Sequence, residues 1–411
     1  MTSDIKKEKK EERHNVLKDE NLYMVFAVTL LSVLGVASVT PAFPQIAIFF
    51  NISPAKTGLI VSAFTIPGII ATPLLGLLAD TCGRKKILVP CLFLFGLSGV
   101  MCAFSRTFNE LLFMRVLQGM GASALNSLNI TIIGDLYQKM LRTEAMGYNS
   151  SVLGVGTAIY PALGGLLSML GWRYPFLLPI AAIPVALWVM LRLKQTDLPK
   201  HKASQPFRKM FQAFSSPMAI LLFSTSTVTF IILYGAFLTF LPFYLNSNFQ
   251  ATALQIGLIS AFMSLSSAIV AFNMKNISKM LSERVRLSFA FVLYCLALII
   301  ALYLPNCLSA LIPAGLMGAA QGLNMPTLMT MITNIAPEGN RAAFISLNSM
   351  SLRLGQTIGP FLMGIIYSLL GINYVFSSGA ILAGTMSAVL YFALKKSPNK
   401  PRLLSNNSHK N

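Results

Sequence analysis

Long apolar runs separated by short polar connections dominate this sequence of 411 residues. A helix that crosses a bilayer needs about 20 apolar residues, and twelve such stretches lie between Leu22 and Leu394. The pattern therefore predicts an all-α membrane protein with twelve transmembrane helices. The expected spans are residues 22–43, 57–79, 87–104, 109–134, 145–170, 173–191, 218–245, 255–274, 287–304, 308–333, 343–370 and 373–394.

One polar interruption is longer than the others and divides the twelve spans into six and six. It covers residues 192–217 and contains Pro199, Pro206 and Pro217 among many basic residues. Prolines and charges are typical of a linker. The expected organisation is a cytoplasmic polar tail (1–21), an N-terminal six-helix bundle (22–191), a cytoplasmic linker (192–217), a C-terminal six-helix bundle (218–394) and a cytoplasmic basic tail (395–411).

The two halves share an internal repeat. Gln118-Gly119 matches Gln321-Gly322 at an offset of 203, and the following segments align at an offset of 199. The pairs at the second offset are Arg142 with Arg341, Asn149 with Asn348, Gly156 with Gly355, Pro161 with Pro360 and Gly165 with Gly364. Parallel repeats of this kind predict two bundles with pseudo-twofold symmetry and a binding site near the bilayer midplane.

The net charge of +19 follows the predicted membrane topology. With the N-terminus inside, 27 of the 32 Lys and Arg residues fall in inner segments, and only Lys56, Arg106 and Arg173 fall in outer loops. This bias indicates that both termini are cytoplasmic. It also favours contact with anionic lipid and argues against a nucleic-acid partner. The polar first 21 residues are not a cleavable signal peptide.

Two predicted helices carry polar stripes. Arg115, Gln118, Asn126 and Asn129 lie within one narrow face of helix 4, at about 100° per residue. Helix 11 has a similar face with Ser346, Ser349, Arg353 and Gln356. Such faces either join helices or line a wet cavity. The two arginines favour the cavity, because ionisable residues inside a membrane are functional by default.

Four motifs resemble those of the major facilitator superfamily, and more narrowly its twelve-span drug:proton antiporter branch. They are LGVASVTPAFP (34–44, with Pro41 and Pro44), GLLADTCGRKK (76–86), RVLQGMG (115–121) and GTAIYPALGG (156–165). The resemblance extends from Leu22 to Leu394. It implies the two-bundle fold of that superfamily and transport by alternating access.

The resemblance also implies roles for two of the motifs. Gly76, Asp80, Gly83 and Arg84 would form a conformational lock between helices 2 and 3, in which Asp80 pairs with charges at helix 11. Thr81 stands where the superfamily usually has arginine. The helix 5 residues that would mark an exporter are Gly156, Pro161, Gly164 and Gly165. Tyr160 replaces the central glycine of that motif, so we expect its bulk to separate helices there.

Other chemistries lack the residues that they need. The five cysteines show no C-x-x-C spacing, no phosphate-binding loop is present, and the three histidines lie outside the spans. We therefore expect no enzyme, no metal and no cofactor. No carboxylate is embedded in the middle of a span, and Glu110 lies at the very end of one, so a transported proton would be carried by Asp80, Asp135 or another acid at a membrane edge.

The sequence thus predicts a monomeric, multi-pass secondary transporter of the inner plasma membrane that exports small lipophilic compounds in exchange for protons. Two alternatives stay open. The embedded arginines also suit the import or export of a metabolite anion or siderophore, and a non-transporting sensor can have the same fold.

Overall fold

The computed structural model describes residues 16–137, 139–193, 216–336 and 341–396. Most of the predicted linker and of both tails therefore lies outside the described residues. The same holds for the side chains of Asp80, Asn126 and Arg341. In the described ranges the chain consists of helices and their connections, without a β-strand.

The N-terminal half contains three 3₁₀ turns, η1 (Val16–Lys18), η2 (Thr40–Ala42) and η3 (Tyr174–Ala181). Its helices are α2 (Glu20–Ala37), α3 (Phe43–Phe49), α4 (Pro54–Thr57), α5 (Leu59–Cys82), α6 (Arg84–Ala103), α7 (Phe108–Leu136), α8 (Lys139–Ser168) and α9 (Ala182–Arg192).

The C-terminal half contains a π-helical segment, η4 (Ile231–Leu238), and two short turns, η5 (Leu308–Ala310) and η6 (Leu394–Lys396). Its helices are α11 (Pro217–Phe230), α12 (Thr239–Phe249), α13 (Ala253–Phe272), α14 (Met274–Met280), α15 (Glu283–Ala301), α16 (Leu311–Ile335), α17 (Arg341–Leu370) and α18 (Ile372–Ala393).

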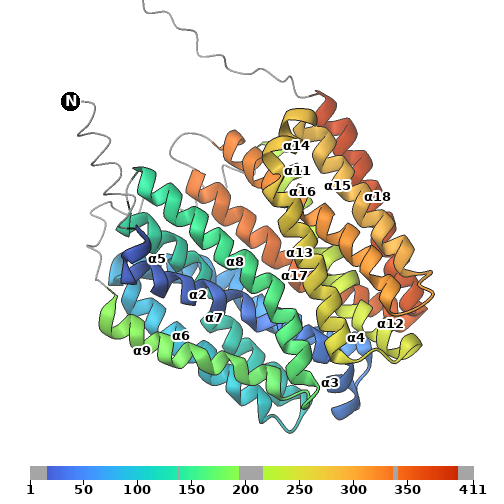
Figure 1. Ribbon diagram of the computed structural model, residues 1–411, viewed down its shortest axis with the longest axis horizontal. Helices are drawn as coiled ribbons and strands as arrows, with labels where there is room; N and C mark the ends of the chain where they lie inside the picture. The colour runs from blue at the N-terminus through green and yellow to red at the C-terminus, as the bar shows by residue number, and fades with distance from the viewer. Residues whose placement is uncertain (1–15, 138, 194–215, 337–340, 397–411) are drawn as a thin grey trace, which may run out of the picture.

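Each of the twelve predicted spans coincides with a helix or a helical run. Within the described chain, nine of these runs are long and apolar enough to cross a membrane. The other three are α7, α16 and α17, which carry embedded polar side chains. Figure 1 shows the two halves side by side, coloured blue to green and yellow to red. We call the end where α2 begins and α18 ends the terminal side, and the opposite end the far side.

The faces of the helices explain why the bundles suit lipid. Each half has its own buried apolar cluster, around Leu92, Phe95 and Leu125 in the first half and around Phe237 and Phe291 in the second. Large apolar side chains also point outward, such as Ile70 at 67% exposure and Phe272 at 89%. Water would disfavour such surfaces, whereas lipid accepts them.

Proline breaks the first predicted span. The helix α2 ends at Ala37, and α3 continues the path only from Phe43. Pro41 lies in η2 and Pro44 in the first turn of α3. Because proline has no backbone N–H, it fits the first turn of a helix and interrupts a continuous one.

The internal repeat of the sequence extends to the contacts between helices. Gly119 of α7 packs on the carbonyl of Phe64 of α5, and Gly318 of α16 packs on the carbonyl of Met263 of α13. Both members of the first contact are thus related to the second by 199 residues. The predicted offset of 203 recurs as well, because Gly322 packs on the carbonyl of Ser267, and both residues lie 203 positions after Gly119 and Phe64.

Candidate functional site

Two equivalent seams join the halves at the far side. Gly58 packs against Pro360, with 3.0 Å from an ideal Cβ at residue 58 to the proline Cβ, and Gly257 packs against the carbonyl of Pro161. Gly257 lies 199 residues after Gly58, and Pro360 lies 199 residues after Pro161, so the two contacts occupy equivalent positions in the repeat. One seam joins α4 and α5 to α17, and the other joins α13 to α8. The lack of a side chain at both glycines is what permits this approach.

A second contact continues each seam one turn further along. An ideal Cβ at Gly165 lies 2.5 Å from the carbonyl oxygen of Ala253, and one at Gly364 lies 3.1 Å from that of Ala55. In Figure 1, α8 and α13 draw together toward the end where α3, α4 and α12 lie, and separate toward the other end. The halves are therefore closed against each other at the far side.

Among the described residues, side-chain hydrogen bonds cross only one of the two seams. The Ser62 hydroxyl donates to the carbonyl of Thr357 at 2.7 Å, and the hydroxyls of Thr65 and Thr357 are 2.8 Å apart. The residue equivalent to Thr357 in the other seam is Ala158. The α5–α17 seam is consequently polar, and the α8–α13 seam depends on packing.

The predicted helix 5 motif contacts two neighbours at once. Gly156 and Gly164 face α2, where they meet Leu30 and the carbonyl of Ser38, while Pro161 and Gly165 face α13 in the other half. The Tyr160 ring packs against the apolar cluster of the N-terminal half, and its Cε2 atom lies 3.3 Å from an ideal Cβ at Gly156, where α8 meets α2. The helices still approach closely at Gly164 and Gly165.

The helix 1 motif borders a cavity at the far side. Pro41 and Pro44 are buried, and with Gln45 they line a space of about 340 Å³. Asn246 and Gln250, from the turn between α12 and α13, line its other wall. The motif thus lies where the first half meets the second.

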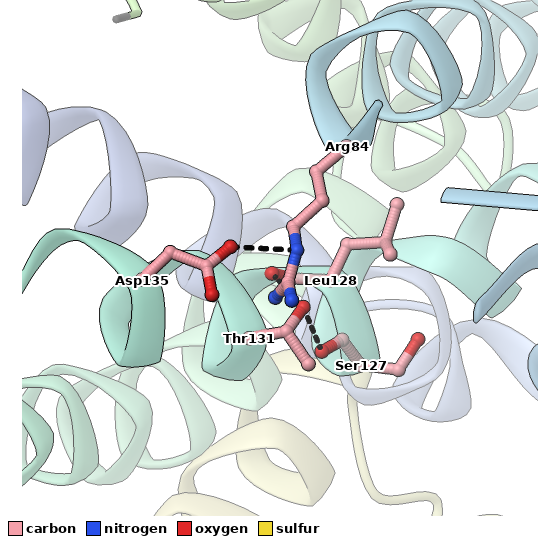
Figure 2. Close-up of polar contacts among 5 residues, drawn as sticks. All are labelled: Arg84, Ser127, Leu128, Thr131 and Asp135. Carbon is pink, nitrogen blue, oxygen red and sulfur yellow. Dashed lines mark hydrogen bonds and ion pairs between the residues drawn. The ribbon is translucent and has the colours of Figure 1, made fainter. Parts of the chain in front are cut away.

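The charged turn between α5 and α6 contains an ion pair. Gly83 adopts a φ of 99°, which favours glycine, and so allows α6 to begin directly at Arg84. The Nε atom of Arg84 lies 2.7 Å from Oδ2 of Asp135 at the end of α7 (Figure 2). Gly76 has open space where a Cβ would stand. The position of the Asp80 carboxylate lies outside the described residues.

Both members of this ion pair stand at the unfavourable end of a helix. Arg84 is the first residue of α6, where the helix dipole is positive, and Asp135 is in the last turn of α7, where the dipole is negative. Their side chains are 11% and 25% exposed. Each helix end would by itself repel the charge that it carries. The attraction between Arg84 and Asp135 offsets both repulsions.

Other polar contacts hold the terminal side of the first half together. The Lys85 ammonium donates to the carbonyl of Leu193 at 3.0 Å, just after α9. The Tyr137 hydroxyl donates to Asp19 at 2.6 Å. Burial, and then this carboxylate, raise the pKa of Tyr137, so its hydroxyl stays protonated. These two pairs could not be predicted from the sequence, because their members are far apart in the chain.

Arg115 does not border a cavity, contrary to our expectation. It is 1% exposed, and its guanidinium donates to the carbonyls of Gly35 (2.8 Å) and Ile60 (3.2 Å) and to Oε1 of Gln118 (2.7 Å). The Phe64 ring lies 4.4 Å below it. The carbonyls of Gly35, in the last turn of α2, and Ile60, in the first turn of α5, take the place of water around this charge.

Asn129 of the helix 4 stripe also joins helices. Asn129 donates to the carbonyl of Val25 at 2.9 Å and to the hydroxyl of Thr29, which itself donates to Asn149 at 2.5 Å. This network ties α7 and α8 to α2. The second half repeats it: Asn324 donates to Thr229 at 2.7 Å, and Ser226 donates to Asn348 at 2.6 Å.

Arg353 is different, because it lies between the two halves. Its guanidinium packs against Gly68 of α5, occupying the space that a side chain at residue 68 would need. The charge also acts on Tyr234 of η4, whose hydroxyl interacts with the Gln356 side chain. The described contacts of Arg353 include no carboxylate. Gly68 and Tyr234 are members of this group that the polar stripe alone did not indicate.

No group of three or more His, Cys, Asp or Glu side chains in the described ranges could hold a metal ion. The polar groups that the structure gathers are thus a helix-joining network in each half, an ion pair at the charged turn, and an arginine between the halves.

Comparisons with known proteins agree with this architecture. The sequence model of the Major Facilitator Superfamily matches residues 25–315 and 235–410. The chain is 26% identical to "Multidrug resistance protein 2" of Bacillus subtilis (84% of this chain, 87% of the relative) and 23% identical to "Quinolone resistance protein NorA" of Staphylococcus aureus (85% and 90%).

A solved structure is similar over almost the whole length. It is a bacterial homologue of the human lysosomal transporter Spinster, in an inward-facing and occupied conformation, with a TM-score of 0.75, 18% identity, and coverage of 92% of this chain and 96% of that one. The predicted fold class and the resemblance to the drug-exporting branch are confirmed. The chain belongs to the major facilitator superfamily, and it is a multi-pass membrane transporter rather than an enzyme.

Proposed function

We propose that this transporter exports small lipophilic compounds by alternating access and exchanges them for protons. The observation that carries the proposal is the pair of equivalent seams, Gly58 with Pro360 and Gly257 with Pro161. Two symmetry-related contacts at one side can open together when one half rocks against the other. The relatives named for multidrug and quinolone resistance support a drug-like substrate.

The distribution of basic residues supports an orientation. With both termini in the cytoplasm of a bacterial cell, the terminal side is cytoplasmic and the far side is external. The arrangement described above then faces inward, ready to accept a compound from the cytoplasm or the inner leaflet. The domain boundaries expected from the sequence and a monomeric state belong to the same proposal.

The charged turn is the proposed place of coupling. Asp80 lies in the last turn of α5, three residues before Gly83, and Arg84 pairs with Asp135. Protonation of Asp135 would weaken its attraction to Arg84, and protonation of Asp80 would remove a negative charge from the same turn. Either change would alter which state of the transporter is favoured. Both acids lie at the membrane edge, which water reaches.

A second candidate is transport of an organic anion. It rests on Arg353, which lies between the halves beside Gly68 and has no carboxylate among its described contacts. A cation held in low dielectric stabilises an anion strongly. This alternative predicts that anionic substrates depend on Arg353, whereas neutral ones depend on it much less.

One experiment separates the two candidates. Inside-out vesicles are energised with a proton gradient and offered a panel of neutral, cationic and anionic compounds, with wild type, Asp80→Asn and Arg353→Gln compared. Gradient-driven accumulation of several lipophilic compounds that is lost in Asp80→Asn is the expected result. Accumulation of anions alone, lost in Arg353→Gln, would replace the first candidate by the second.

A further inference from the structure

The lipid-facing surface of the C-terminal half contains an apolar groove between α15 and α18. Its volume is about 460 Å³, within the range of about 300–1,000 Å³ of small-molecule sites. Most of its lining is apolar: Val285, Phe289, Val292 and Leu296 come from α15, and Gly384 and Ala388 come from α18. Neither the superfamily fold nor the proposed export path assigns a role to this groove.

The length of the groove matches one leaflet of a bilayer. Val285 and Leu296 are eleven residues apart, or about 16 Å along a helix. Half of the hydrocarbon layer is about 15 Å. The groove starts near the terminal side, at the first turn of α15, and ends near the middle of the membrane.

Its floor is open enough for an acyl chain. An ideal Cβ at Gly384 would meet only the sulfur of Cys295, at 3.8 Å. Gly384 lies in the interior of α18, so it is not needed for a turn, and no neighbouring helix approaches it closely. The space that it leaves belongs to the groove.

Polar donors without acceptors mark the end of the groove at the terminal side. The Arg284 guanidinium lies 3.8 Å above the ring of Tyr391, which closes that end. Its Nε atom is buried and has no hydrogen-bond partner among the described residues. The hydroxyl of Ser288, a lining residue only 7% exposed, is likewise without a partner there.

Two unsatisfied donors require an acceptor that the described protein does not supply. The surrounding charge favours an anionic one. In the described part of the C-terminal half Glu283 is the only acid, whereas Arg284, Arg286 and Lys395 stand at the same ends of α15 and α18. A phosphodiester oxygen would accept from Arg284 through a charge-assisted bond.

From these features we infer that the groove binds an anionic phospholipid of the leaflet at the terminal side. One acyl chain lies along α15 over Gly384, and the phosphate is held by Arg284 with Ser288 donating to an ester oxygen. Lipid is the occupant because the groove lies along a transmembrane face, and its terminal-side leaflet attracts basic residues through anionic headgroups.

Native mass spectrometry of the delipidated, detergent-purified transporter tests this inference. The protein is titrated with phosphatidylglycerol or with phosphatidylcholine of the same acyl chains. The wild type is expected to retain phosphatidylglycerol preferentially. Arg284→Gln should weaken that binding roughly tenfold or more, because the charge-assisted hydrogen bond to the phosphate is lost.

Two further variants complete the design. Gly384→Leu fills the groove and should reduce adducts of both lipids, while Arg192→Gln removes an exposed arginine at the terminal side of α9 and should bind as the wild type does. Equal binding of both lipids, equal losses in Arg284→Gln and Arg192→Gln, or a dimer in place of a lipid adduct would overturn the inference. If Gly384→Leu does not fold, the comparison of phosphatidylglycerol binding by Arg284→Gln and Arg192→Gln still tests the inference. None of these readouts depends on transport.

Discussion

The two arginines embedded in the membrane look alike in the sequence and have different surroundings. Arg115 is enclosed by carbonyls of its own half, and Arg353 lies between the halves against Gly68. A polar stripe indicates that a helix face points inward. It cannot indicate whether that face meets water, a carbonyl or another half, because the neighbours come from distant segments.

Replacement of Arg115 should act on stability. Arg115→Ala removes three hydrogen bonds and leaves three buried acceptors unpaired, so we expect a loss of about 3 kcal/mol. Arg115→Lys should recover part of it, because lysine keeps the charge but not the fork of donors. The measurement is the thermal unfolding midpoint of the purified protein in detergent. An unchanged midpoint in Arg115→Ala would mean that these bonds do not hold the half together.

Gly68 should affect transport rather than stability. In Gly68→Ala the new methyl group takes the place of the Arg353 guanidinium, which must move. We expect altered efflux of a fluorescent lipophilic compound with a normal unfolding midpoint. The matched control is Gly154→Ala, because a Cβ at residue 154 meets nothing within 4 Å.

A double variant shows whether Gly68 acts through Arg353. Once Arg353→Gln is present, adding Gly68→Ala should change efflux little, since contacting residues are not additive. Independent, additive effects in the double variant would separate the two residues and contradict the packing argument.

At the scale of helices, the charged turn and the proline breaks set where elements end. Gly83 belongs to the motif expected between helices 2 and 3, and its φ of 99° makes it the residue at which the chain turns. The sequence did not predict that Arg84 would pair with Asp135, because the 50 residues between them form most of two helices. Pro41 and Pro44 were recognised as a motif, yet the division of the first span into α2, η2 and α3 needed the structure.

The ion pair between α6 and α7 makes a prediction at this scale. Arg84→Gln and Asp135→Asn each leave one charge at the wrong end of a helix, so each should lower the unfolding midpoint. The double variant removes both charges and should lose less than the sum of the two. Coupling of about 0.5–3 kcal/mol in this cycle is the expected range for contacting residues. Strict additivity would show that the pair contributes nothing as a pair.

At the scale of the whole molecule, the repeat in sequence is also a repeat in contacts. Five identities at the offset of 199 were enough to predict duplication, and Pro161 and Pro360 among them are the residues that meet Gly257 and Gly58. The glycines themselves could not be selected beforehand, because 28 glycines are present and most contact neighbours within one half. The side on which the two halves are closed could be identified only from the contacts between them in the structure.

The central claim is that the far side is closed here and must open during transport. A disulfide across the α4–α17 contact tests it directly. An ideal Cβ at residue 364 lies 3.6 Å from the Cβ of Ala55, which is within the 3.5–4.5 Å that a disulfide needs. The pair Ala55→Cys and Gly364→Cys is made in a chain whose five native cysteines are replaced by serine.

Efflux is then measured before oxidation, after oxidation and after reduction. We expect the bond to form readily, efflux to stop when it forms, and reduction to restore it, while each single cysteine variant is unaffected by the oxidant. Efflux at the rate of the reduced protein with the bond intact would contradict the claim that the two halves part at the far side.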